Sequence, residues 1–553
     1  MDIRSLPQLA RNTGRFRDVV GTLVKYGLAP WMRNVGIEWM QRLFRDSDGR
    51  DIGSMSQEVR VRKALTELGT TYIKLGQILS TRPDLIGPEL AEELEKLQAD
   101  TPADPPAEVR ALLQAELGAT PEELFGEFDD QAFASASIGQ VHAARMKDGR
   151  AVVVKVQHPG IEDRIHNDLE IMQSMAELAE QYSPELRQYR PVETTAEFSR
   201  TLLGELDFTR EQRNLHAFIR NFSKQDDVRI PGAYPELSSR RVLTMDRLEG
   251  MSMADREALE ASGYDLSEIA ERGASLFLNM IFRDGFYHAD PHPGNLMVLS
   301  GGAIGLLDCG MVGRIDERLR EQIEDMLVAA VRHDGAALCD LIVRMGSVPP
   351  DLDDARLQAD VEEFLAEYAK ESLKDFDLSG ALNGMTAIIR RYGIMLPARV
   401  SLLLKVLVML EGTSRNLNPD FSLAELLEPW QAKAIKRRLS PQRMLHRMQG
   451  AWSDWSRLGE SFPRDLSDIL TQIKRGHFDV HLEHRRLEQT VNRLVMGILS
   501  AALFMGSAQL WSRNVPPLVA GSSIPGAAGC VLGVLLGFRL LRAIKRSGDI
   551  EVR

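Results

Sequence analysis

The first part of the chain has the apolar spacing of helices. Residues 56–100 repeat apolar positions at the helical period, with a break near Pro83, and residues 108–128 predict a short helical pair. Between them, residues 101–107 (TPADPPA) have the composition of a linker. The pattern therefore predicts a helical extension before the next domain.

The pattern then changes to that of β-strands. Residues 132–157 contain two strand-like runs on either side of a hairpin turn at Gly149. Residues 162–222 are helical in period, residues 228–250 contain strand-like runs, and helices dominate from Leu266 onward. A strand-rich part followed by a helix-rich part favours a two-lobed α+β enzyme over a Rossmann sheet.

Two long uncharged stretches near the C-terminus depart from the pattern of a water-soluble protein. Leu494–Trp511 and Leu518–Phe538 contain no charged residue, and at about 1.5 Å per residue each approaches the thickness of a hydrocarbon core. Pro516 and Pro517 lie in the polar turn between them. We predict a transmembrane helical hairpin, with a pair of buried core helices as the alternative.

Basic residues flank this predicted hairpin. They are Arg486 and Arg493 before the first stretch, and Arg539, Arg542, Lys545 and Arg546 after the second. The positive-inside rule then places both ends, and the soluble bulk, in the cytoplasm. Gly529, Gly533 and Gly537 recur every four residues, which predicts a smooth face for close helix packing and for a homodimer.

Two further segments are basic and amphipathic. Residues 8–45 contain several arginines together with Trp31, Trp39 and Phe44, which predicts helices that lie on an anionic bilayer or pack on the protein's own domain. Residues 433–475 form a second basic stretch that leads toward the hairpin. No signal peptide is predicted, because charged residues interrupt the apolar runs near the N-terminus.

The overall composition excludes several classes of protein. Apolar residues make up 44% and charged residues 26% of the 553 residues, which is unlike disordered or collagenous chains. The net charge of −12 argues against binding of nucleic acid by the whole surface. The three cysteines are widely spaced, which favours a reducing compartment and argues against a structural zinc site.

A lysine inside an apolar strand is the first candidate for chemistry. Lys155 lies within AVVVKV, where burial of its ammonium group is costly unless the group meets anions. Nucleotide phosphates and a helix glutamate are the usual partners of such a lysine in kinases. Taken alone, the pattern also fits a strand-end lysine that is exposed to solvent.

Two polar loops farther along add the other parts of a phosphotransferase. The segment His288–Asn295 has the spacing H-x-D-x-x-x-x-N of the kinase catalytic loop, in which Asp290 would accept or orient a hydroxyl proton and Asn295 would hold magnesium. Asp308, in the sequence LDCG, lies where kinases have the magnesium-binding Asp-Phe-Gly. Lys155, the His288–Asn295 loop and Asp308 follow one another in the order found in kinases. This order predicts binding of ATP, or ADP, with Mg²⁺.

Metal-dependent hydrolysis is an alternative for the same loop. His288, Asp290 and His292 alternate along the chain, and such clusters can bind zinc. Pro291 and Pro293 stiffen the loop, however, which makes convergence on one ion difficult. A Walker-type nucleotide site is excluded, because Gly-Lys-Ser/Thr does not occur in the sequence.

Further motifs accompany these residues between positions 56 and 412. KLGQ begins at Lys74, ELD begins at Glu205, and residues 134–142 (ASASIGQVH) are rich in alanine where ordinary kinases have a glycine-rich loop. Together with Lys155 and the two polar loops, these motifs resemble the UbiB family of atypical kinase-like proteins, also called aarF-domain or ADCK proteins. The predicted hairpin is similar to that of the bacterial members that act in ubiquinone biosynthesis.

The resemblance implies a role for each motif. The alanine-rich loop and Lys155 would bind the nucleotide, and the helix of the KxGQ motif (Lys74 to Gln77) would cover the groove where a protein substrate would lie. Lys74 would then point toward Glu205 and Asp207, whereas taken alone it fits a solvated lysine. The implied nucleotide-loop residues are Ala134, Ser135, Ala136, Ser137, Ile138, Gly139, Gln140, Val141 and His142.

Two features depart from the expected patterns. Ala134, Ser135, Ala136 and Ser137 stand where ordinary kinases have a glycine-rich loop, and Ser135 replaces an alanine that is common in the family. The bulk of these side chains should constrain how the nucleotide lies. Cys309 replaces the phenylalanine whose packing separates active from inactive states in kinases. Switching based on a phenylalanine therefore cannot be assumed for this chain.

The glutamate that pairs with Lys155 is open between two candidates. Glu205 and Glu211 lie in one predicted helix, six residues apart, so they point about 120° apart and cannot both face the strand. We favour Glu211 for Lys155 and Glu205 for Lys74. The predicted catalytic residues are Asp290, Lys155, Lys74, Glu205, Asp207 and Glu211, and the predicted metal ligands are Asn295 and Asp308.

The predicted fold class is α+β: a two-lobed protein-kinase-like fold with an N-terminal helical extension and a C-terminal transmembrane hairpin. The predicted segments are basic amphipathic helices (1–55), the KxGQ-containing helical extension (56–131), the N-lobe (132–250), the helical C-lobe (251–430), juxtamembrane basic helices (431–493) and the hairpin (494–541). Each lobe would contribute one side of the nucleotide site.

The resemblance also implies a function and a location. The protein would be a membrane-anchored kinase-like ATPase or phosphotransferase of the bacterial inner membrane that supports ubiquinone biosynthesis by coupling ATP turnover to handling of polyprenyl quinone precursors. Expected partners are membrane lipids, these precursors and other ubiquinone-biosynthesis proteins, and no nucleic acid. The alternatives are a kinase that acts on a protein or a small hydroxyl compound, and a non-catalytic pseudokinase scaffold. The intact kinase-like residues argue against the scaffold.

Overall fold

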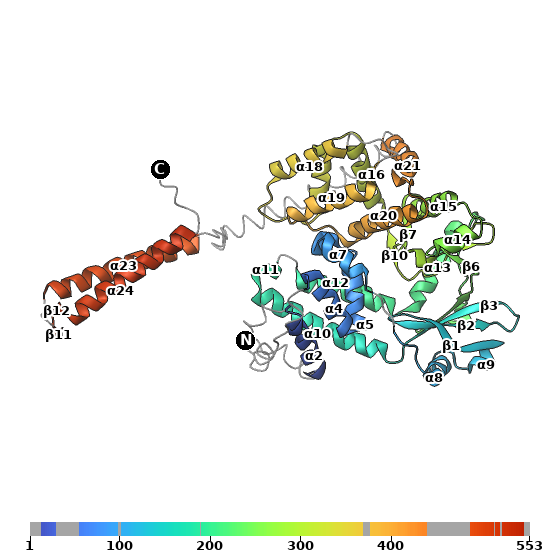
Figure 1. Ribbon diagram of the computed structural model, residues 1–553, viewed down its shortest axis with the longest axis horizontal. Helices are drawn as coiled ribbons and strands as arrows, with labels where there is room; N and C mark the ends of the chain where they lie inside the picture. The colour runs from blue at the N-terminus through green and yellow to red at the C-terminus, as the bar shows by residue number, and fades with distance from the viewer. Residues whose placement is uncertain are drawn as a thin grey trace, which may run out of the picture. The chain divides into compact units, whose positions relative to one another are not determined.

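A computed structural model of the chain describes residues 13–28, 55–97, 101–187, 190–368, 376–438, 487–513, 515–519 and 522–546. It divides into two compact units, Met1–Met444 and Leu445–Arg553 (Figure 1). Most of the predicted N-terminal segment 1–55 and most of the predicted juxtamembrane segment 431–493 lie outside the described residues.

The first unit begins with helices, continues with a sheet and then returns to helices. Before the sheet lie α2 (Thr13–Lys25), α4 (Gln57–Leu68), α5 (Thr70–Leu79), α6 (Pro83–Ile86), α7 (Pro88–Glu95), α8 (Pro106–Leu117) and α9 (Pro121–Leu124). The next elements are β1 (Glu127–Ser135), β2 (Gly139–Arg145), β3 (Ala151–Gln157), α10 (Ile161–Tyr182), α11 (Pro184–Arg187), α12 (Pro191–Glu205), α13 (Phe208–Phe222), β4 (Val228–Arg229), η4 (Pro235–Leu237), β5 (Val242–Asp246) and β6 (Gly250–Ser252). The predicted boundary between residues 131 and 132 therefore falls inside β1.

The sheet of the N-lobe has the strand order β1-β2-β3-β5, and all its neighbours are antiparallel. Successive residues of a strand point to opposite faces. Val152, Val154 and Val156 of β3 are completely buried on one face, where they pack with Leu112 and Leu113 of α8. Burial on this face directs Lys155 to the opposite face. The antiparallel sheet confirms that the fold is not a Rossmann sheet.

Helix α13 is amphipathic, and its apolar face packs in the main core of the unit. Leu215, Phe218 and Phe222 are buried there, and Glu211 lies on the same buried face. The sequence predicted one helix through Glu205 and Glu211, but the chain turns between α12 and α13. Asp207 ends the continuity because its carboxylate caps the new helix by accepting a hydrogen bond from the Thr209 amide.

The predicted helical extension is present as α4 to α7. The break near Pro83 is confirmed, since Pro83 is the first residue of α6, and a second break occurs at Gly69, whose φ of 91° ends α4. Helix α5, which carries the KxGQ motif, contacts α10 and α12. Gly76 of this motif lies against Leu65 and Leu97, where a Cβ atom would clash with both side chains.

The C-lobe supplies the two polar loops from short strands and packs them on helices. Its elements are α14 (Arg256–Ala261), α15 (Leu266–Leu278), the π-helical turn η5 (Asn279–Asp284), β7 (Phe286–His288), η6 (Pro293–Asn295), β8 (Leu296–Leu299), β9 (Ile304–Leu306), β10 (Val312–Arg314), α16 (Glu317–Val331), α17 (Gly335–Met345), α18 (Asp354–Tyr368), α19 (Leu378–Arg391), α20 (Ala398–Leu417) and α21 (Leu423–Arg438). The strands form the sheets β4-β9-β8-β6 and β10-β7. The loop after β7 and the loop after β9 are thereby held side by side.

The second unit is a helical hairpin. It consists of α23 (Leu487–Ser512), β11 (Leu518–Val519), β12 (Ser522–Ser523) and α24 (Ile524–Arg546), and the two helices pack along each other. The second predicted span is not one continuous helix: Leu518–Val519 pairs with Ser522–Ser523 as short antiparallel strands, and α24 begins at Ile524. Among the described helices, only Val495–Ser512 is long and apolar enough to cross a membrane, whereas Ile524–Arg539 is a shorter apolar helix.

The glycines of α24 face the other helix of the same hairpin. Cβ atoms at Gly529 and Gly533 would meet Ser507 and Phe504 of α23, and one at Gly537 would lie 3.5 Å from Ser500 Oγ. The smooth face that the sequence predicted is therefore used for packing within one chain. A homodimer through this face stays a prediction.

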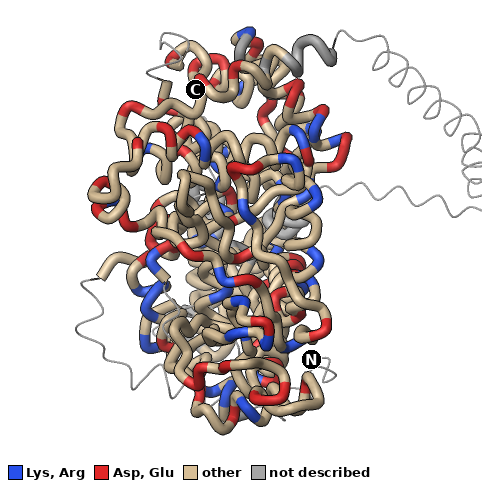
Figure 2. Tube along the Cα trace, turned by 90° about the vertical axis from the view of Figure 1, so that its right-hand side faces the viewer, with Lys and Arg blue, Asp and Glu red and all other residues tan. Residues whose placement is uncertain are grey.

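Charged and apolar side chains are distributed differently in the two units. Positions of lysine and arginine are interspersed with those of aspartate and glutamate along the backbone of the first unit (Figure 2). The large apolar side chains that are exposed lie almost entirely in the hairpin, with Phe133 and Val348 as the exceptions among the described residues. The hairpin thus exposes the kind of surface that soluble proteins bury.

Candidate active site

The charged residues of the two lobes meet around Lys155. Its Nζ atom lies 2.9 Å from Oε2 of Glu211 on α13 and 3.2 Å from Oδ2 of Asp308 in the loop after β9. The Lys155 and Glu211 side chains are 18% and 5% exposed, so this is a mostly buried pair. The structure thereby pairs Lys155 with Glu211, which is the pairing that the sequence analysis favoured.

The electrostatics of this cluster follow from burial and from the shared ammonium group. Burial disfavours the charged form of Lys155, but Asp308 and Glu211 outweigh it and raise the pKa of the lysine. Burial also opposes ionisation of Asp308, yet the Lys155 ammonium and the Gly310 amide hold the pKa of this carboxyl well below its ordinary value. Burial and the charge of Asp308 raise the pKa of Glu211 to about 7.

The loop after β7 holds Asp290 and Asn295 against each other. The Asn295 Nδ2 atom donates to Asp290 Oδ2 over 2.9 Å, which leaves the second carboxylate oxygen of Asp290 without this bond. His288 anchors the loop: its Nε2 atom is bonded to the Asp308 carbonyl, and its Nδ1 atom accepts from the Asp290 amide. His288 is buried, with only 1% of its surface exposed, so the two polar loops are joined through it.

The segment Asp308-Cys309-Gly310 is fixed by its backbone. Gly310 donates its amide to Asp308 Oδ1 over 2.7 Å, and the Cys309 carbonyl accepts from the side chain of Asn214 on α13 over 3.0 Å. The Cys309 side chain has no exposed surface, and burial raises the pKa of its thiol. This position is therefore a small packed residue tied to α13.

The residues present fit a magnesium ion. Asp308 offers carboxylate oxygens, and Asn295 uses its amide nitrogen toward Asp290, which leaves its carbonyl oxygen for a ligand role. Mg²⁺ prefers oxygen donors and is commonly bound through one or two carboxylates plus substrate phosphates. The zinc alternative is weaker, because both nitrogens of His288 are bonded to the backbone. No group of three or more His, Cys, Asp or Glu side chains in the described part of the chain is arranged to hold a metal.

The alanine-rich loop closes as a tight turn between β1 and β2. The Ala136 amide donates to the Gly139 carbonyl over 2.9 Å, and the Ala136 carbonyl is bonded to His158 over 2.8 Å. Gly139 lies so close to Val156 that a Cβ atom would be 2.4 Å from the Val156 carbonyl oxygen. This close approach explains why the one glycine of the loop stands at this position.

Only part of the predicted loop lines the site. Ala136, Ser137, Ile138 and Gly139 line the cavity next to Lys155. The other predicted nucleotide-loop residues do not line it: Ala134, Ser135, Gln140, Val141 and His142. His142 is bonded instead to the Asp129 carbonyl and to Gln140, away from the cavity.

Lys74 reaches the same cavity from the helical extension. Its Nζ atom lies 2.9 Å from Glu205 Oε2, and although burial opposes the charged form, Glu205 raises the pKa of the lysine. The structure thus pairs Lys74 with Glu205 as the sequence analysis favoured. Gln77 does not line the cavity and donates to the Leu97 carbonyl instead. Asp207 lines the cavity and caps α13.

These side chains surround one cavity of about 160 Å³. It brings together Lys74, Lys155, Glu205, Asp207, Glu211, Asp290, Asn295 and Asp308, which are all the predicted catalytic and metal residues. Sequence reasoning missed Gly204, Phe208, Arg210 and Met311. The first three flank the ELD motif, so their sequence position was the available signal. Phe208 lies under the Lys155 ammonium, 5.2 Å from Nζ to the ring centre.

A two-lobed fold with a buried Lys–Glu pair, a loop carrying Asp and Asn, and an Asp-x-Gly segment defines a kinase-like protein. The extra helix that inserts Lys74 into the cavity makes the site atypical. Known sequences agree with this class. The profile of the ABC1 atypical kinase-like domain matches residues 96–341, the UbiB helical domain matches residues 361–422, and the ABC1/UbiB kinase-like C-terminal domain matches residues 481–546.

Relatives extend this similarity over most of the chain. A protein of Marinobacter nauticus named "Probable protein kinase UbiB" is 34% identical over 86% of this chain and 90% of its own length. A Clostridium pasteurianum protein named "Uncharacterized protein in hydrogenase 1 5'region" is 30% identical over 91% of this chain and 96% of its own length. The solved Rv3197–erythromycin complex from Mycobacterium tuberculosis is 27% identical and covers 66% of this chain and 93% of that protein, with a TM-score of 0.44. The chain belongs to the ABC1/UbiB family of atypical kinase-like proteins.

Proposed function

We propose that the protein binds Mg-ATP in this cavity and acts as a membrane-anchored kinase-like ATPase or phosphotransferase. The observation that carries the proposal is the convergence of Lys155, Glu211, Asp290, Asn295 and Asp308 on one cavity. These five side chains come from both lobes and together have the chemistry of phosphate, metal and hydroxyl binding.

Each residue has a defined role in this proposal. Lys155, held in place by Glu211, would donate to phosphate oxygens. Asp308 and Asn295 would hold Mg²⁺, which neutralises phosphate charge when it is bound. Asp290, whose second carboxylate oxygen is left free by Asn295, would accept or orient the proton of a hydroxyl group or of water.

The position of the Lys74–Glu205 pair supports a small acceptor or water. The pair lines the same cavity as Asp290 and Lys155. An extended protein segment would need this pair and the helix that carries Lys74 to move away. A protein kinase is therefore the less favoured alternative, and a kinase for a small hydroxyl compound remains compatible with the geometry.

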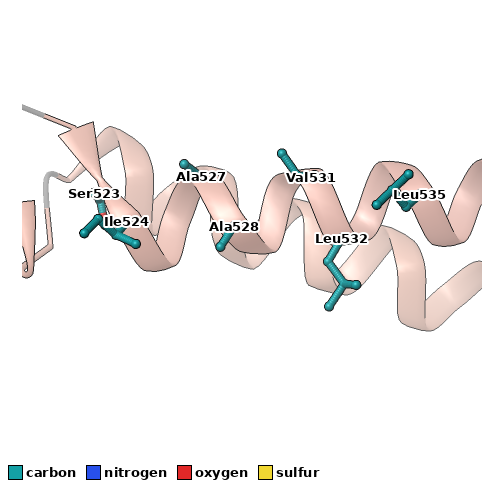
Figure 3. A pocket seen from close by; sticks show the side chains of 7 residues that line it. All are labelled: Ser523, Ile524, Ala527, Ala528, Val531, Leu532 and Leu535. Atoms are coloured by element: carbon teal, nitrogen blue, oxygen red, sulfur yellow. The ribbon is translucent and has the colours of Figure 1, made fainter. Parts of the chain in front are cut away.

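The hairpin supports membrane anchorage. Its outward face is apolar along both helices, for example at Leu499 (58% exposed) and Leu535 (60% exposed). A shallow groove on α24 is lined by Ser523, Ile524, Ala527, Ala528, Val531, Leu532 and Leu535, and Figure 3 shows these side chains projecting along the helix. We propose that lipid covers this surface and that both helices enter the bilayer, the second through its shorter apolar part.

The orientation and the pathway complete the proposal. Arg539, Arg542, Lys545 and Arg546 would hold the end of α24 at the cytoplasmic side, so the kinase-like unit would face the cytoplasm at the bacterial inner membrane. Relatives that carry the name UbiB support a role in ubiquinone biosynthesis. ATP turnover would be coupled to handling of polyprenyl quinone precursors at the membrane surface, together with other proteins of that pathway.

The test is ATP hydrolysis by the purified protein with and without anionic liposomes and a phenolic mimic of a quinone precursor. The proposal expects Mg-dependent hydrolysis that liposomes or the mimic increase, and a loss of this hydrolysis in Asp290→Asn. Phosphate transfer to the mimic would identify a small-molecule kinase. No hydrolysis and no transfer under any condition would support the pseudokinase scaffold instead.

A further inference from the structure

The cavity contains a third basic side chain that the proposed function does not yet use. Arg210, in the first turn of α13, lines the same cavity as Lys74 and Lys155. It immediately precedes Glu211, and since successive helix residues point about 100° apart, its guanidinium group leaves the buried face that Glu211 occupies. Arg210 is exposed to solvent where it lines the cavity, so a ligand can reach it.

The ion pairs of the cavity leave Arg210 without a carboxylate. Lys74 pairs with Glu205, and Lys155 pairs with Glu211 and Asp308. Asp207, three residues before Arg210, uses its carboxylate to cap α13. Among the described residues, no side chain or carbonyl forms an ion pair or hydrogen bond with the Arg210 guanidinium group.

A glycine on the neighbouring helix leaves the space that this guanidinium group occupies. A Cβ atom on Gly204 would lie 2.0 Å from Arg210 Nη1 and 3.2 Å from Cζ. Gly204 is the next-to-last residue of α12, has no left-handed backbone conformation, and would be more stable as alanine by helix propensity alone. Glycine at this position therefore fits a need for space beside Arg210.

We propose that Arg210 binds the terminal phosphate of the nucleotide and that Gly204 keeps the guanidinium group in position for it. The proposal rests on the proposed nucleotide site. A guanidinium group can donate two parallel hydrogen bonds to one phosphate, and it stays charged at any pH the protein meets. In a cavity of about 160 Å³ whose two lysines each have a carboxylate partner, Arg210 adds a guanidinium group that has none.

The alternative role for Arg210 is structural, and the two roles predict opposite results for Gly204→Ala. The clashing atoms belong to the far end of a flexible side chain, so Arg210 can swing away and the helix gains a better helix former. The proposal therefore expects a variant whose melting temperature without ligand is no lower than that of the wild type, but whose ATP binding is weaker. If Arg210 had only a structural role, Gly204→Ala would not weaken ATP binding without also lowering the melting temperature.

The experiment measures binding of ATP, ADP, AMP and inorganic tripolyphosphate, each with Mg²⁺, to the full-length protein in detergent. The variants are Arg210→Gln, Arg210→Lys and Gly204→Ala. The matched control is Arg220→Gln, which removes the same charge from the same helix but does not line the cavity. Loss of a hydrogen-bonded charge should weaken ATP and tripolyphosphate binding by about tenfold to a hundredfold in Arg210→Gln, with little change for AMP.

The outcomes separate this proposal from the one on which it rests. A smaller loss in Arg210→Lys, a loss in Gly204→Ala without lower stability, and an unchanged Arg220→Gln would support it. The role of Arg210 would be overturned if Arg210→Gln bound ATP as tightly as the wild type, or if the variant lost affinity equally for ATP and AMP. The proposed nucleotide site would stand in both cases. If the wild type binds neither ATP nor tripolyphosphate, the proposed function itself is wrong.

Discussion

Val152, Val154 and Val156 of the N-lobe have no exposed surface, whereas Ile498, Met505 and Phe538 of the hairpin are 61%, 67% and 64% exposed. Residues of one chemical kind are therefore shielded from solvent by the protein in one unit and left uncovered in the other. Inside the hairpin the contacts are small and polar instead. Ser500 donates to the Gly533 carbonyl over 2.7 Å, as helices do when packing and hydrogen bonds, rather than apolar burial, hold them together.

The same contrast applies to charge. The first unit places several of its charged side chains in one cavity, where each lysine has a carboxylate partner. Between Val495 and Phe538, the described residues include a single charged one, Arg513, in the turn between the helices. Under the proposed function, the first unit would bind a charged ligand in water and the hairpin would meet lipid. The predictions below change one unit while leaving the other in place.

The largest effect should follow removal of the hairpin. A chain that ends at Glu488 should be released from membranes by a carbonate or high-salt wash, while the full-length protein stays bound, because burial of apolar helices does not depend on charge. The measurement is the fraction of protein in the membrane pellet. Equal retention of both chains would show that the hairpin is not the main anchor.

A smaller effect should appear in how the unfolding free energy of the first unit depends on pH. The pKa of Glu211 is raised to about 7 in the folded protein from an ordinary value near 4.5, so between these pH values the folded state binds a proton that the unfolded state has lost. Stability should therefore fall as pH rises from about 4.5 to 7, by up to about 1.4 kcal/mol per pH unit for one proton.

The variant Glu211→Gln cannot take up this proton, so its unfolding free energy should vary less over the same pH range. Denaturant unfolding in detergent at several pH values measures the difference. A wild type and a variant with parallel pH profiles would mean that Glu211 ionises normally in the folded state.

The smallest effect on stability should come from Lys74→Ala. The Lys74 side chain is 22% exposed and that of Glu205 19%, so loss of this pair should cost about 1 kcal/mol of unfolding free energy. ATP turnover should change severalfold, because Lys74 lines the cavity. The control is Lys96→Ala, which removes a lysine paired with Glu93 in the same helical extension but away from the cavity. Equal ATP turnover in both variants and the wild type would show that Lys74 does not influence turnover, as expected for a solvated lysine.

Much of the kinase-like unit could be predicted from the sequence because its patterns are local. The run of valines around Lys155 is typical of a buried strand, and the spacing within His288–Asn295 and from there to Asp308 indicates the two loops. Helix geometry indicated only that Glu205 and Glu211 could not both face the strand, and its premise of one helix was wrong. The structure supplies the pairing of Lys155 with Glu211 that was favoured. The break between α12 and α13 was not predictable from apolar periodicity, since it depends on the capping bond of Asp207.

Other features depend on contacts between distant segments. The place of Arg210 in the cavity depends on the path of α12 into α13, which no single motif encodes. The loop residues His142 and Gln140 turn away because Asp129 and Asp104 offer them partners. In the hairpin, an uncharged run alone cannot separate helix from strand, so the sequence does not predict the strands β11 and β12 before α24.

The central claim is that the cavity binds Mg-ATP, and the melting temperature of the full-length protein in detergent tests it most directly. ATP with Mg²⁺ should stabilise the protein, by about 2.7 kcal/mol at a concentration one hundred times Kd, and ATP with a chelator should stabilise it less. Asp308→Asn should lose the difference between the two conditions. The absence of any shift with Mg-ATP in the wild type, or an undiminished magnesium dependence in Asp308→Asn, would contradict the account.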